Sequence, residues 1–254
     1  MNQASNAVAT DELAPAARYA ESKLCLALDG LSLERSLSLT SKLGEHCHAV
    51  KIHDLNDAEG PHAVKLLRKV GAKRIWVDAK LHDTKDTVAL RAGALARNGA
   101  NIITVHASGG IPMRKAAIDA VFTDCGPAAS IWAITILTSL DPKEIASIYG
   151  ADRTPQQIVL DLALMAKEAG VNGLVCSAKE VGMLSAHRDL LGMVLTVPGT
   201  RSAGINLGQQ KRSGTPAQAI ADGARFLVAG TQVTKAEHPV VAFKAMAAEI
   251  GMQL

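Results

Sequence analysis

The sequence predicts an α/β protein that folds as a single (β/α)8 barrel. Eight short apolar runs recur along the chain, stretches with helical periodicity lie between them, and a glycine repeatedly separates a helical stretch from the next apolar run. Eight such units in 254 residues fit the usual size of one barrel. The same pattern leaves an open doubly wound sheet as the alternative fold.

The eight apolar runs are the expected strands. Their apolar residues follow one another instead of alternating with polar residues, which is typical of parallel strands that are covered on both faces. The runs occupy residues 24–29, 49–52, 74–78, 102–106, 131–137, 173–177, 193–199 and 226–230.

The stretches between these runs are the expected helices. Residues 61–70 and 87–98 repeat apolar side chains at intervals of three and four positions, as one face of a helix requires. Thr215 and Pro216 indicate a helix start, because the hydroxyl can cap the first turn and proline fits within it. Glycine adopts the left-handed conformation that ends a helix, and four glycines stand where a helix should stop: Gly71, Gly99, Gly170 and Gly223.

Two segments depart from the simple repeat. Residues 140–170 exceed the length of one helix, so we expect a substrate-covering loop after the fifth strand and an extra helix. Residues 1–22 precede the first strand, and we expect an N-terminal extension there. A catalytic barrel domain over residues 23–254 is expected to follow it.

The composition argues against several classes of partner. There are 27 basic and 24 acidic residues, with no long block of like charge, so neither nucleic acid nor a membrane surface is an expected partner. No run approaches the ~18 apolar residues of a membrane span, and the N-terminus lacks the pattern of a secretory signal. The four cysteines form no C-x-x-C pair. We therefore expect a cytoplasmic protein in a reducing compartment.

Polar and charged side chains gather where the expected strands end. In barrels of this class the active site is built from strand ends and the loops that follow them. The residues at these places come from six strands, and we expect them to converge on one mouth: Asp29, Lys51, Asp78, Lys80, Asp83, His106, Thr138, Ser139, Pro198, Gly199 and Arg201.

The third strand carries the densest group of charges. Asp78 and Lys80 are two residues apart, so in a strand they point to the same face and both enter the barrel mouth. Lysines interleaved with aspartates form a network in which each ion stays paired where water is excluded. A lysine held in this way is available as a proton donor. The alternative interpretation is a solvated strand end with surface ion pairs.

The end of the chain predicts a phosphate site. Arg201 and Gln210 flank a polar, glycine-containing loop after the seventh strand, and Gly230 and Thr231 follow the eighth. These two places commonly build a phosphate site in barrels of this class, so a phosphorylated small molecule is the expected ligand. The alternative is a pair of ordinary polar loops.

The chain resembles the orotidine 5'-phosphate decarboxylase family, and its bacterial branch in particular, over about residues 23–245. No single motif carries the resemblance, because the D-x-K-x-x-D core also occurs in relatives that act on other sugar phosphates. The motifs that carry it together are LALD at 26–29, VK at 50–51, DAKLHDTKDTV at 78–88, HASGG at 106–110, LTS at 137–139, VCSAKE at 175–180, TVPGTRSAG at 196–204 and TPAQAIADGA at 215–224.

The resemblance implies a decarboxylation of orotidine 5'-monophosphate to uridine 5'-monophosphate without metal or cofactor, the last step of pyrimidine nucleotide synthesis. Lys80 would protonate C6 of the pyrimidine, Asp78 would lie against the substrate carboxylate, and Lys51 would complete the charge network. Asp83 would reach into the site of a neighbouring subunit, which implies a homodimer with shared sites. The remaining contacts implied for substrate are Asp29 and Thr87 at the ribose, Thr138 and Ser139 near the base, Arg201 and Gln210 at the phosphate, and Pro198, Gly230 and Thr231 in the adjoining loops.

The sequence departs from the family pattern at two places. The family usually ends the eighth strand with Gly-Arg-Pro, whereas this chain has Gly230, Thr231 and Gln232. A threonine hydroxyl cannot replace a bidentate guanidinium, so weaker phosphate binding is expected. The second departure is Thr84-Lys85-Asp86, where the family has Ile-Pro-Asn. Lys85 is either a compensating positive charge or an exposed side chain.

Two other functions remain compatible with parts of the pattern. A magnesium-dependent relative that acts on a keto-sugar phosphate would share D-x-K-x-x-D, but such relatives typically place a metal-binding acid where Lys51 stands. A non-catalytic barrel that senses a nucleotide would have little use for a proton donor paired with a carboxylate. Sensitivity to a chelator separates the first alternative from the decarboxylase, and turnover separates the second.

Overall fold

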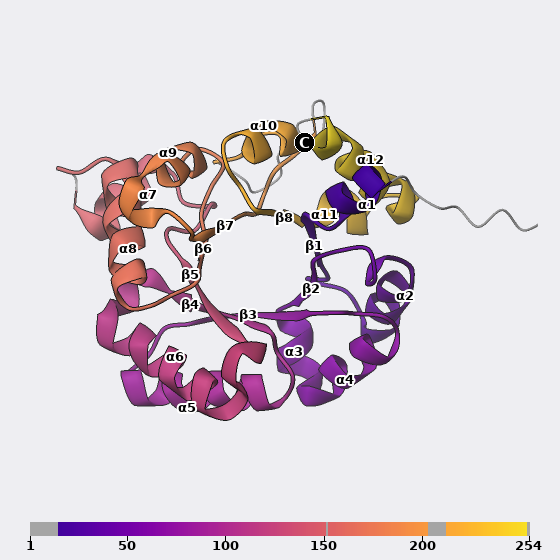
Figure 1. Ribbon diagram of the computed structural model, residues 1–254, viewed down its shortest axis with the longest axis horizontal. Coiled ribbons are helices and arrows are strands. Elements are labelled where there is room, and N and C mark those ends of the chain that lie inside the picture. Colours follow the sequence, from indigo (N-terminus) through magenta and orange to yellow (C-terminus); the bar gives the residue numbers. More distant parts are fainter. Residues whose placement is uncertain (1–14, 151, 203–211, 253–254) are drawn as a thin grey trace, which may run out of the picture.

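A computed structural model describes residues 15–150, 152–202 and 212–252. Eight parallel strands form a closed barrel in chain order, and the last strand pairs with the first through Leu24 and Leu227 (Figure 1). This closure confirms the predicted (β/α)8 barrel and excludes the open sheet. The strands are β1 (Leu24–Ala27), β2 (Ala49–Ile52), β3 (Ile75–Leu81), β4 (Ile102–His106), β5 (Ser130–Ile134), β6 (Gly173–Val175), β7 (Val194–Val197) and β8 (Phe226–Ala229).

Helices surround the barrel as a ring (Figure 1). In the described part of the chain they are α1 (Pro15–Glu21), α2 (Leu33–Leu43), α3 (Asp54–Glu59), α4 (Pro61–Lys69), α5 (Lys85–Arg97), α6 (Gly110–Cys125), α7 (Pro142–Tyr149), α8 (Pro155–Glu168), α9 (Val181–Ala186), α10 (Pro216–Ala221), α11 (Thr231–Thr234) and α12 (Pro239–Gly251). Helix α1, which is the described part of the segment before the first strand, lies against α12. No helix among the described residues is long and apolar enough to span a bilayer.

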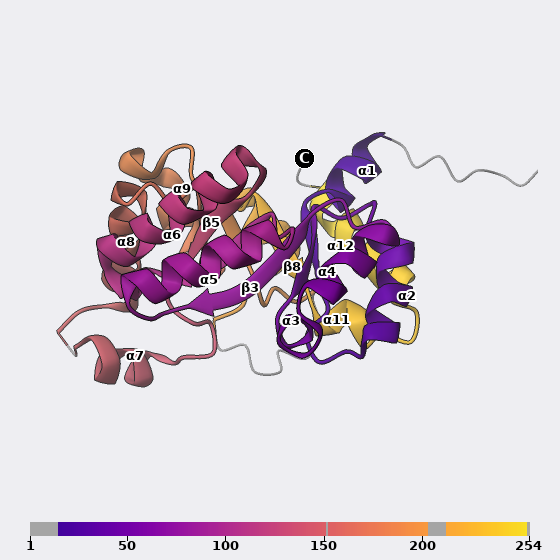
Figure 2. The ribbon, with the colours of Figure 1, turned by 90° about the horizontal axis from the view of Figure 1, so that it is seen from below.

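The predicted helix boundaries are confirmed by the local geometry. The Thr215 side chain accepts a hydrogen bond from the backbone of Gln218 and so caps α10. The four predicted stop glycines all have positive φ, between 88° and 115°. Residues 140–170 contain the expected extra helix, α7, which begins with a capping box formed by Asp141 and Glu144. Figure 2 shows α7 standing apart from the helical ring.

The predicted strand ends differ from the observed ones in both directions. Several apolar runs continue past the strand, because their last residues, such as Ile136, Leu137 and Pro198, line a cavity instead of pairing in the sheet. The third strand shows the opposite error: it was expected to end at residue 78 and runs to Leu81. Its charged end therefore belongs to the barrel wall.

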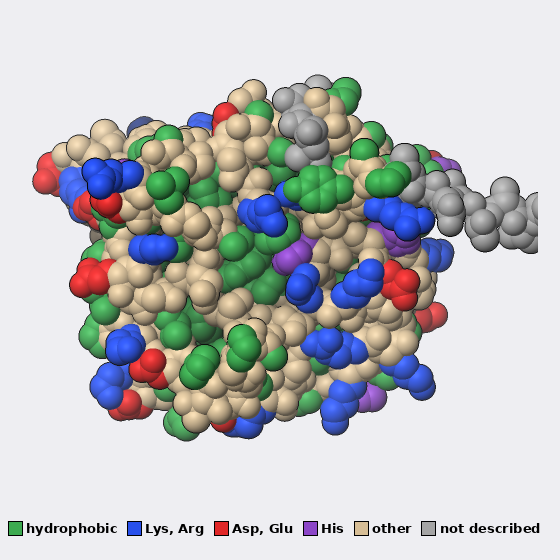
Figure 3. All heavy atoms as spheres, viewed as in Figure 1, with side chains coloured by type: hydrophobic (Ala, Val, Ile, Leu, Met, Phe, Trp, Pro, Cys, Tyr) green, Lys and Arg blue, Asp and Glu red, His purple; other side chains and the backbone are tan. Residues whose placement is uncertain are grey.

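The barrel interior contains three aromatic side chains, although only 3% of the chain is aromatic. Trp76, Trp132 and Phe226 form one buried cluster, with ring centroids 5.2 Å and 6.1 Å apart along the series. Gly173 is required beside it, because a Cβ there would lie 2.7 Å from the Trp132 ring. Figure 3 shows apolar side chains at the centre of the molecule, where the barrel lies. Because the interior is packed, a ligand that binds to the barrel is expected at the strand ends.

Candidate active site

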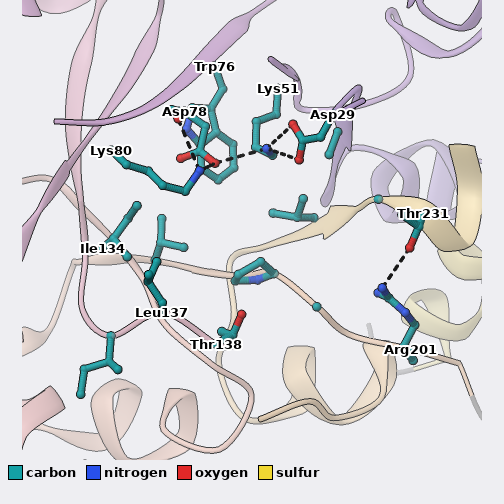
Figure 4. A pocket seen from close by; sticks show the side chains of 17 residues that line it. Asp29, Lys51, Trp76, Asp78, Lys80, Ile134, Leu137, Thr138, Arg201 and Thr231 are labelled. Carbon is teal, nitrogen blue, oxygen red and sulfur yellow. Dashed lines mark hydrogen bonds and ion pairs between the residues drawn. The ribbon is translucent and has the colours of Figure 1, made fainter. Parts of the chain in front are cut away.

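One cavity opens where the strands end, and residues from seven of the eight strands and their loops line it. Ten of the predicted site residues are among them: Asp29, Lys51, Asp78, Lys80, Thr138, Pro198, Gly199, Arg201, Gly230 and Thr231. For these residues the strand ends converge on one mouth, as expected from the sequence. Figure 4 shows these side chains in two groups, a charged cluster on one side and Arg201 with Thr231 on the other.

The charged cluster is a chain of alternating ions. Lys51 Nζ lies 2.7 Å and 2.8 Å from the two Asp29 carboxylate oxygens and 3.2 Å from Asp78 Oδ2. Lys80 Nζ lies 2.6 Å from the same Asp78 oxygen. Asp78 is therefore held between two ammonium groups, and its other oxygen accepts a hydrogen bond from the Thr104 hydroxyl at 2.7 Å. Anions and cations alternate, so each of the two buried members, Lys51 and Asp78, lies between groups of opposite charge.

Electrostatics fix the charge states of the two buried members of this cluster, Asp78 and Lys51. Burial favours the neutral form of Asp78, but Lys51 and Lys80, together with hydrogen bonds to the carboxylate, outweigh it and lower the Asp78 pKa to about 2. Burial likewise disfavours charge on Lys51, yet the Asp78 and Asp29 carboxylates raise its pKa above the ordinary value. Asp78 is consequently an anion, and Lys51 a cation, throughout the neutral range.

The depressed Asp78 pKa predicts an acid-dependent loss of stability. The Asp78 pKa is about 2 in the folded state and has an ordinary value of 3.8. The carboxylate therefore stabilises the fold fully at pH values above 3.8, and this stabilisation is lost as the pH falls to about 2. Between about pH 5 and about pH 2, the unfolding free energy of the unmodified chain should fall by about 2 kcal/mol more than that of Asp78→Asn. Urea titrations across this range measure the difference, and parallel curves for the two proteins would contradict it.

A bulge in β3 aims Lys80 into the cavity. The pairing of β3 with β4 shifts between Val77 and Leu81, so that four steps along β3 match two along β4. Lys80 has a φ of 47°, the only positive value outside glycine in the described residues, which costs on the order of 1–3 kcal/mol. Its backbone N–H donates to Thr104 Oγ1 at 3.0 Å. Asp78 and Lys80 thus both face the cavity, as alternation along a strand predicts, although this strand is locally irregular.

Three side chains of the site were not found from the sequence as functional residues. Thr104 is fully buried and binds both the Asp78 carboxylate and the Lys80 backbone, but a β-branched residue in a strand is unremarkable in a sequence. Trp76 forms the floor beneath the charged cluster and shares the inward parity of Asp78. Leu137, more than one-third exposed, adds to an apolar wall with Ile134 (Figure 4). These apolar residues provide a surface for a flat ring.

The opposite end of the cavity contains one arginine. Arg201 donates to the Thr200 carbonyl at 2.8 Å and to Thr231 Oγ1 at 3.0 Å. Gln232 binds the next residue, Ser202, through both the backbone N–H at 3.2 Å and the hydroxyl at 2.5 Å. Burial lowers the Arg201 pKa from its high ordinary value, and an arginine side chain stays cationic in proteins. Thr231 and Gln232 therefore hold the loop that carries Arg201.

Four predicted site residues within the described chain do not line the cavity: Asp83, Thr87, His106 and Ser139. Asp83 is exposed and accepts a hydrogen bond from the Thr84 backbone at 2.6 Å. Thr87 is half-buried and pairs with the Thr84 hydroxyl at 3.0 Å, and Ser139 is exposed. Lys85, whose role the sequence left open, is exposed and lies 2.7 Å from Asp86. Gln210 lies outside the described residues.

The donor chemistry of the charged cluster does not suit a divalent cation. A magnesium site needs carboxylate oxygens that are free to coordinate, whereas Asp29 and Asp78 both direct oxygens at Lys51 Nζ. Among the described residues, no group of three or more His, Cys, Asp or Glu side chains is arranged to hold a metal ion. The four cysteines, all described, are unpaired and scattered.

Known proteins resemble this chain in sequence and in structure. The family model "Orotidine 5'-phosphate decarboxylase / HUMPS family" matches residues 22–246. An orotidine 5'-phosphate decarboxylase of Moorella thermoacetica is 39% identical over 241 residues, covering 92% of this chain and 94% of the relative. One from Marinomonas is 37% identical over 235 residues, covering 91% and 98%.

A solved structure agrees with these relatives. The crystal structure of orotidine 5'-phosphate decarboxylase from Lactobacillus acidophilus superposes with a TM-score of 0.76 at 31% identity, covering 89% of this chain and 98% of that one. Sequence and fold match over the same, nearly complete, length. The chain belongs to the orotidine 5'-phosphate decarboxylase / HUMPS family.

Proposed function

We propose that this chain decarboxylates orotidine 5'-monophosphate to uridine 5'-monophosphate, with Lys80 as the proton donor. The observation that carries the proposal is the alternating cluster in which Lys80 Nζ and Lys51 Nζ flank the Asp78 carboxylate at 2.6 Å and 3.2 Å. The substrate is anionic at both ends, with a carboxylate on the base and a phosphate on the ribose. The cavity offers a cationic group for each end, and an apolar wall between them accommodates the ring.

The reaction follows from this arrangement. The substrate carboxylate lies beside Asp78, and the two negative charges repel each other. This repulsion is relieved when the carboxylate leaves as neutral CO2. As the bond between C6 and the carboxylate breaks, its electron pair stays on C6. The Lys80 ammonium stabilises this developing charge and transfers a proton to C6. Lys80 is left neutral and regains its proton from water.

The other cavity residues would bind and orient the nucleotide. Asp29, which is half exposed while bound to Lys51, offers its free lone pairs to ribose hydroxyls. Thr138 lies beside Leu137 near the place for the base, and Arg201 would bind the phosphate with its charge. Pro198, Gly230 and Thr231 shape the phosphate end, with Ser139, Thr87 and Gln210 completing the contacts when substrate and partner are bound.

We expect activity to survive chelation, which separates this function from that of a magnesium-dependent relative. The purified protein should decrease the absorbance of orotidine 5'-monophosphate and release uridine 5'-monophosphate and CO2. EDTA should leave the rate unchanged, because Lys51 already occupies the space between the two carboxylates. Loss of activity in EDTA, restored by magnesium, would favour the metal-dependent alternative, and absence of any turnover would overturn the proposal.

The position of Asp83 supports a homodimer with shared sites. Asp83 lies five residues after Asp78 but is exposed and does not line its own chain's cavity. The segment His82–Asp86 is exposed as a whole, so a second copy can receive Asp83 at the edge of its cavity.

A complementation experiment tests this arrangement. Lys80→Ala and Asp83→Asn should each be inactive alone, because each removes a different group from every site. Mixed and refolded together, they should regain about a quarter of full activity, since half of the dimers are mixed and each mixed dimer contains one intact site. The double variant mixed with Lys80→Ala is the control and should regain none. No recovery in the first mixture would show that sites are not shared.

A further inference from the structure

A buried ion pair lies next to the phosphate end of the cavity without lining it. Glu180 is 1% exposed and Arg212 is 4% exposed, and Arg212 Nη2 lies 2.5 Å from Glu180 Oε1. The hydroxyl of Ser177, which is fully buried, donates to the other Glu180 oxygen. Neither charged group faces the cavity, so the proposed chemistry does not use this pair.

The pair joins two segments that come from different strands. Glu180 ends the turn that follows β6 and begins α9, and Arg212 lies in the connection between β7 and α10. The two backbones approach closely here, because a Cβ added at Gly214 would lie 2.9 Å from the Ala178 side chain. The turn after β6 is fixed by the barrel. It therefore provides a rigid support for residues 212–214.

This support reaches Arg201 through the backbone. The N–H of Arg201 donates to the carbonyl of Gly214 at 3.0 Å, two residues from Arg212. The position of Arg201 thus depends on where the 212–214 segment lies. On its other side Arg201 is held by Thr231 Oγ1 at 3.0 Å, a neutral contact without geometric rigidity of its own.

A buried ion pair contributes little net free energy to folding. Its main effect is to fix how the two segments lie relative to each other. Two ions taken out of water lose several kcal/mol of hydration each, and an apolar pair of equal volume would often be as stable. What an apolar pair lacks is charge: within the described residues neither Arg212 Nη atom makes a hydrogen bond, so it is the attraction between the buried guanidinium and the Glu180 carboxylate that keeps the two segments together. A displacement of about 1 Å at a substrate-positioning group can cost on the order of 10²-fold in rate.

We propose that the Glu180–Arg212 pair is a positioning pair that holds Arg201 in place to bind the substrate phosphate. The inference rests on the proposed function and adds to it two residues that touch neither substrate nor reacting atoms. Its mechanical route is short: Glu180 holds Arg212, the 212–214 segment follows, and the Gly214 carbonyl fixes the Arg201 backbone.

The test is a double-mutant cycle on kcat/KM for orotidine 5'-monophosphate. Glu180→Gln keeps the shape of the side chain and its contact with Ser177 while removing the charge, and Arg212→Gln removes the partner. Each should lower kcat/KM about 10- to 100-fold. In an Arg201→Ala background, Arg212→Gln should have little further effect, because the group that it positions is already absent.

A matched control separates positioning from general loss of stability. Glu21 is also a buried glutamate, 3% exposed and 3.0 Å from His46 Nδ1, but it precedes β1 at the opposite end of the barrel. Glu21→Gln should lower the melting temperature as Glu180→Gln does and leave kcat/KM unchanged. Affinity for uridine, which lacks the phosphate, should be equal in the unmodified protein and in the Glu21, Glu180 and Arg212 variants. Among these three variants, affinity for uridine 5'-monophosphate should fall only in those of Glu180 and Arg212.

The outcomes distinguish failure of the positioning role from failure of the proposed function. Additive effects of Arg212→Gln and Arg201→Ala, or equal losses with uridine and its phosphate, would overturn the positioning role while leaving the decarboxylase function intact. Absence of turnover in the unmodified protein would instead overturn the function. Where Arg212→Gln fails to fold, Arg212→Lys and the charge-free double variant Glu180→Gln/Arg212→Gln take its place. If Arg212→Lys keeps kcat/KM near that of the unmodified protein, the positioning role depends on the positive charge, as proposed. If Arg212→Lys lowers kcat/KM, and does so equally with and without Arg201, the positioning role is wrong.

Discussion

Replacement of Lys80 by alanine is expected to lower kcat for orotidine 5'-monophosphate by at least about 10⁴-fold. The substitution removes two contributions at once: the cation that stabilises charge developing on C6 and the proton that quenches it. Lys51, the other lysine among the described residues that line the cavity, does not take its place, because this residue is buried and its Nζ is bound to Asp29 and Asp78. Stopped-flow or long-time absorbance assays with substrate in excess measure the loss.

A control variant and a binding measurement distinguish loss of the proton donor from disruption of the site. Lys115, an exposed lysine 3.5 Å from Asp119, also pairs with an aspartate, and Lys115→Ala should retain full activity. Lys80→Ala should still bind uridine 5'-monophosphate, because the phosphate and ribose contacts remain. Comparable turnover in Lys80→Ala and the unmodified protein would sink the assignment of Lys80 as the acid. If Lys80→Ala loses both nucleotide binding and turnover, the substitution has instead disrupted the folding of the site.

The fold could be predicted because its signals are local. A strand covered on both faces must be apolar along its length, and a helix that returns to the barrel must stop, so apolar runs and glycines such as Gly99 and Gly170 carry the repeat in the sequence itself. Strand ends were less predictable. Ile136 and Leu137 are apolar like a strand, but they line the cavity, and a single sequence does not distinguish pairing from lining.

The candidate site was predictable in its charges and not in its supports. Ions such as Asp78 and Lys80 stand out at the end of an apolar strand because burying them requires partners. Thr104 contacts both and gives no such signal, since its hydroxyl is only informative once the fold brings β4 beside the bulge in β3. The Glu180–Arg212 pair joins residues far apart in the chain, and no spacing rule connects them.

The bulge explains why the strand argument succeeded at Lys80. A single extra residue in β3 would have turned the Lys80 side chain away from the cavity, because side chains alternate between faces. The observed shift sets four steps of β3 against two of β4, an even difference that preserves the parity. The cost appears as the positive φ of Lys80. Strain is thus concentrated at the residue that is proposed to transfer the proton.

The phosphate end carries the second large effect. Arg201→Ala should lower kcat/KM for orotidine 5'-monophosphate about 10²- to 10³-fold, because a charge-assisted contact between guanidinium and phosphate is lost from a partly buried site. Part of the loss should appear in kcat, since binding energy at the remote phosphate helps to hold the reacting end in place. Arg188→Ala, at a side chain that is 91% exposed, is the control and should have no effect.

A substitution at Thr231 tests the same phosphate contact in the opposite direction, by adding a positive charge. The family usually has an arginine at this place, whereas this chain has a hydroxyl that accepts a hydrogen bond from Arg201 Nη2. Thr231→Arg should lower KM about tenfold, because a second guanidinium adds a charged contact to the phosphate dianion. In the Arg201→Ala background the same substitution should recover part of the lost activity. Steady-state kinetics at two salt concentrations test both, since a charge contact weakens as salt rises. Unchanged kcat/KM in Arg201→Ala would show that the phosphate binds elsewhere.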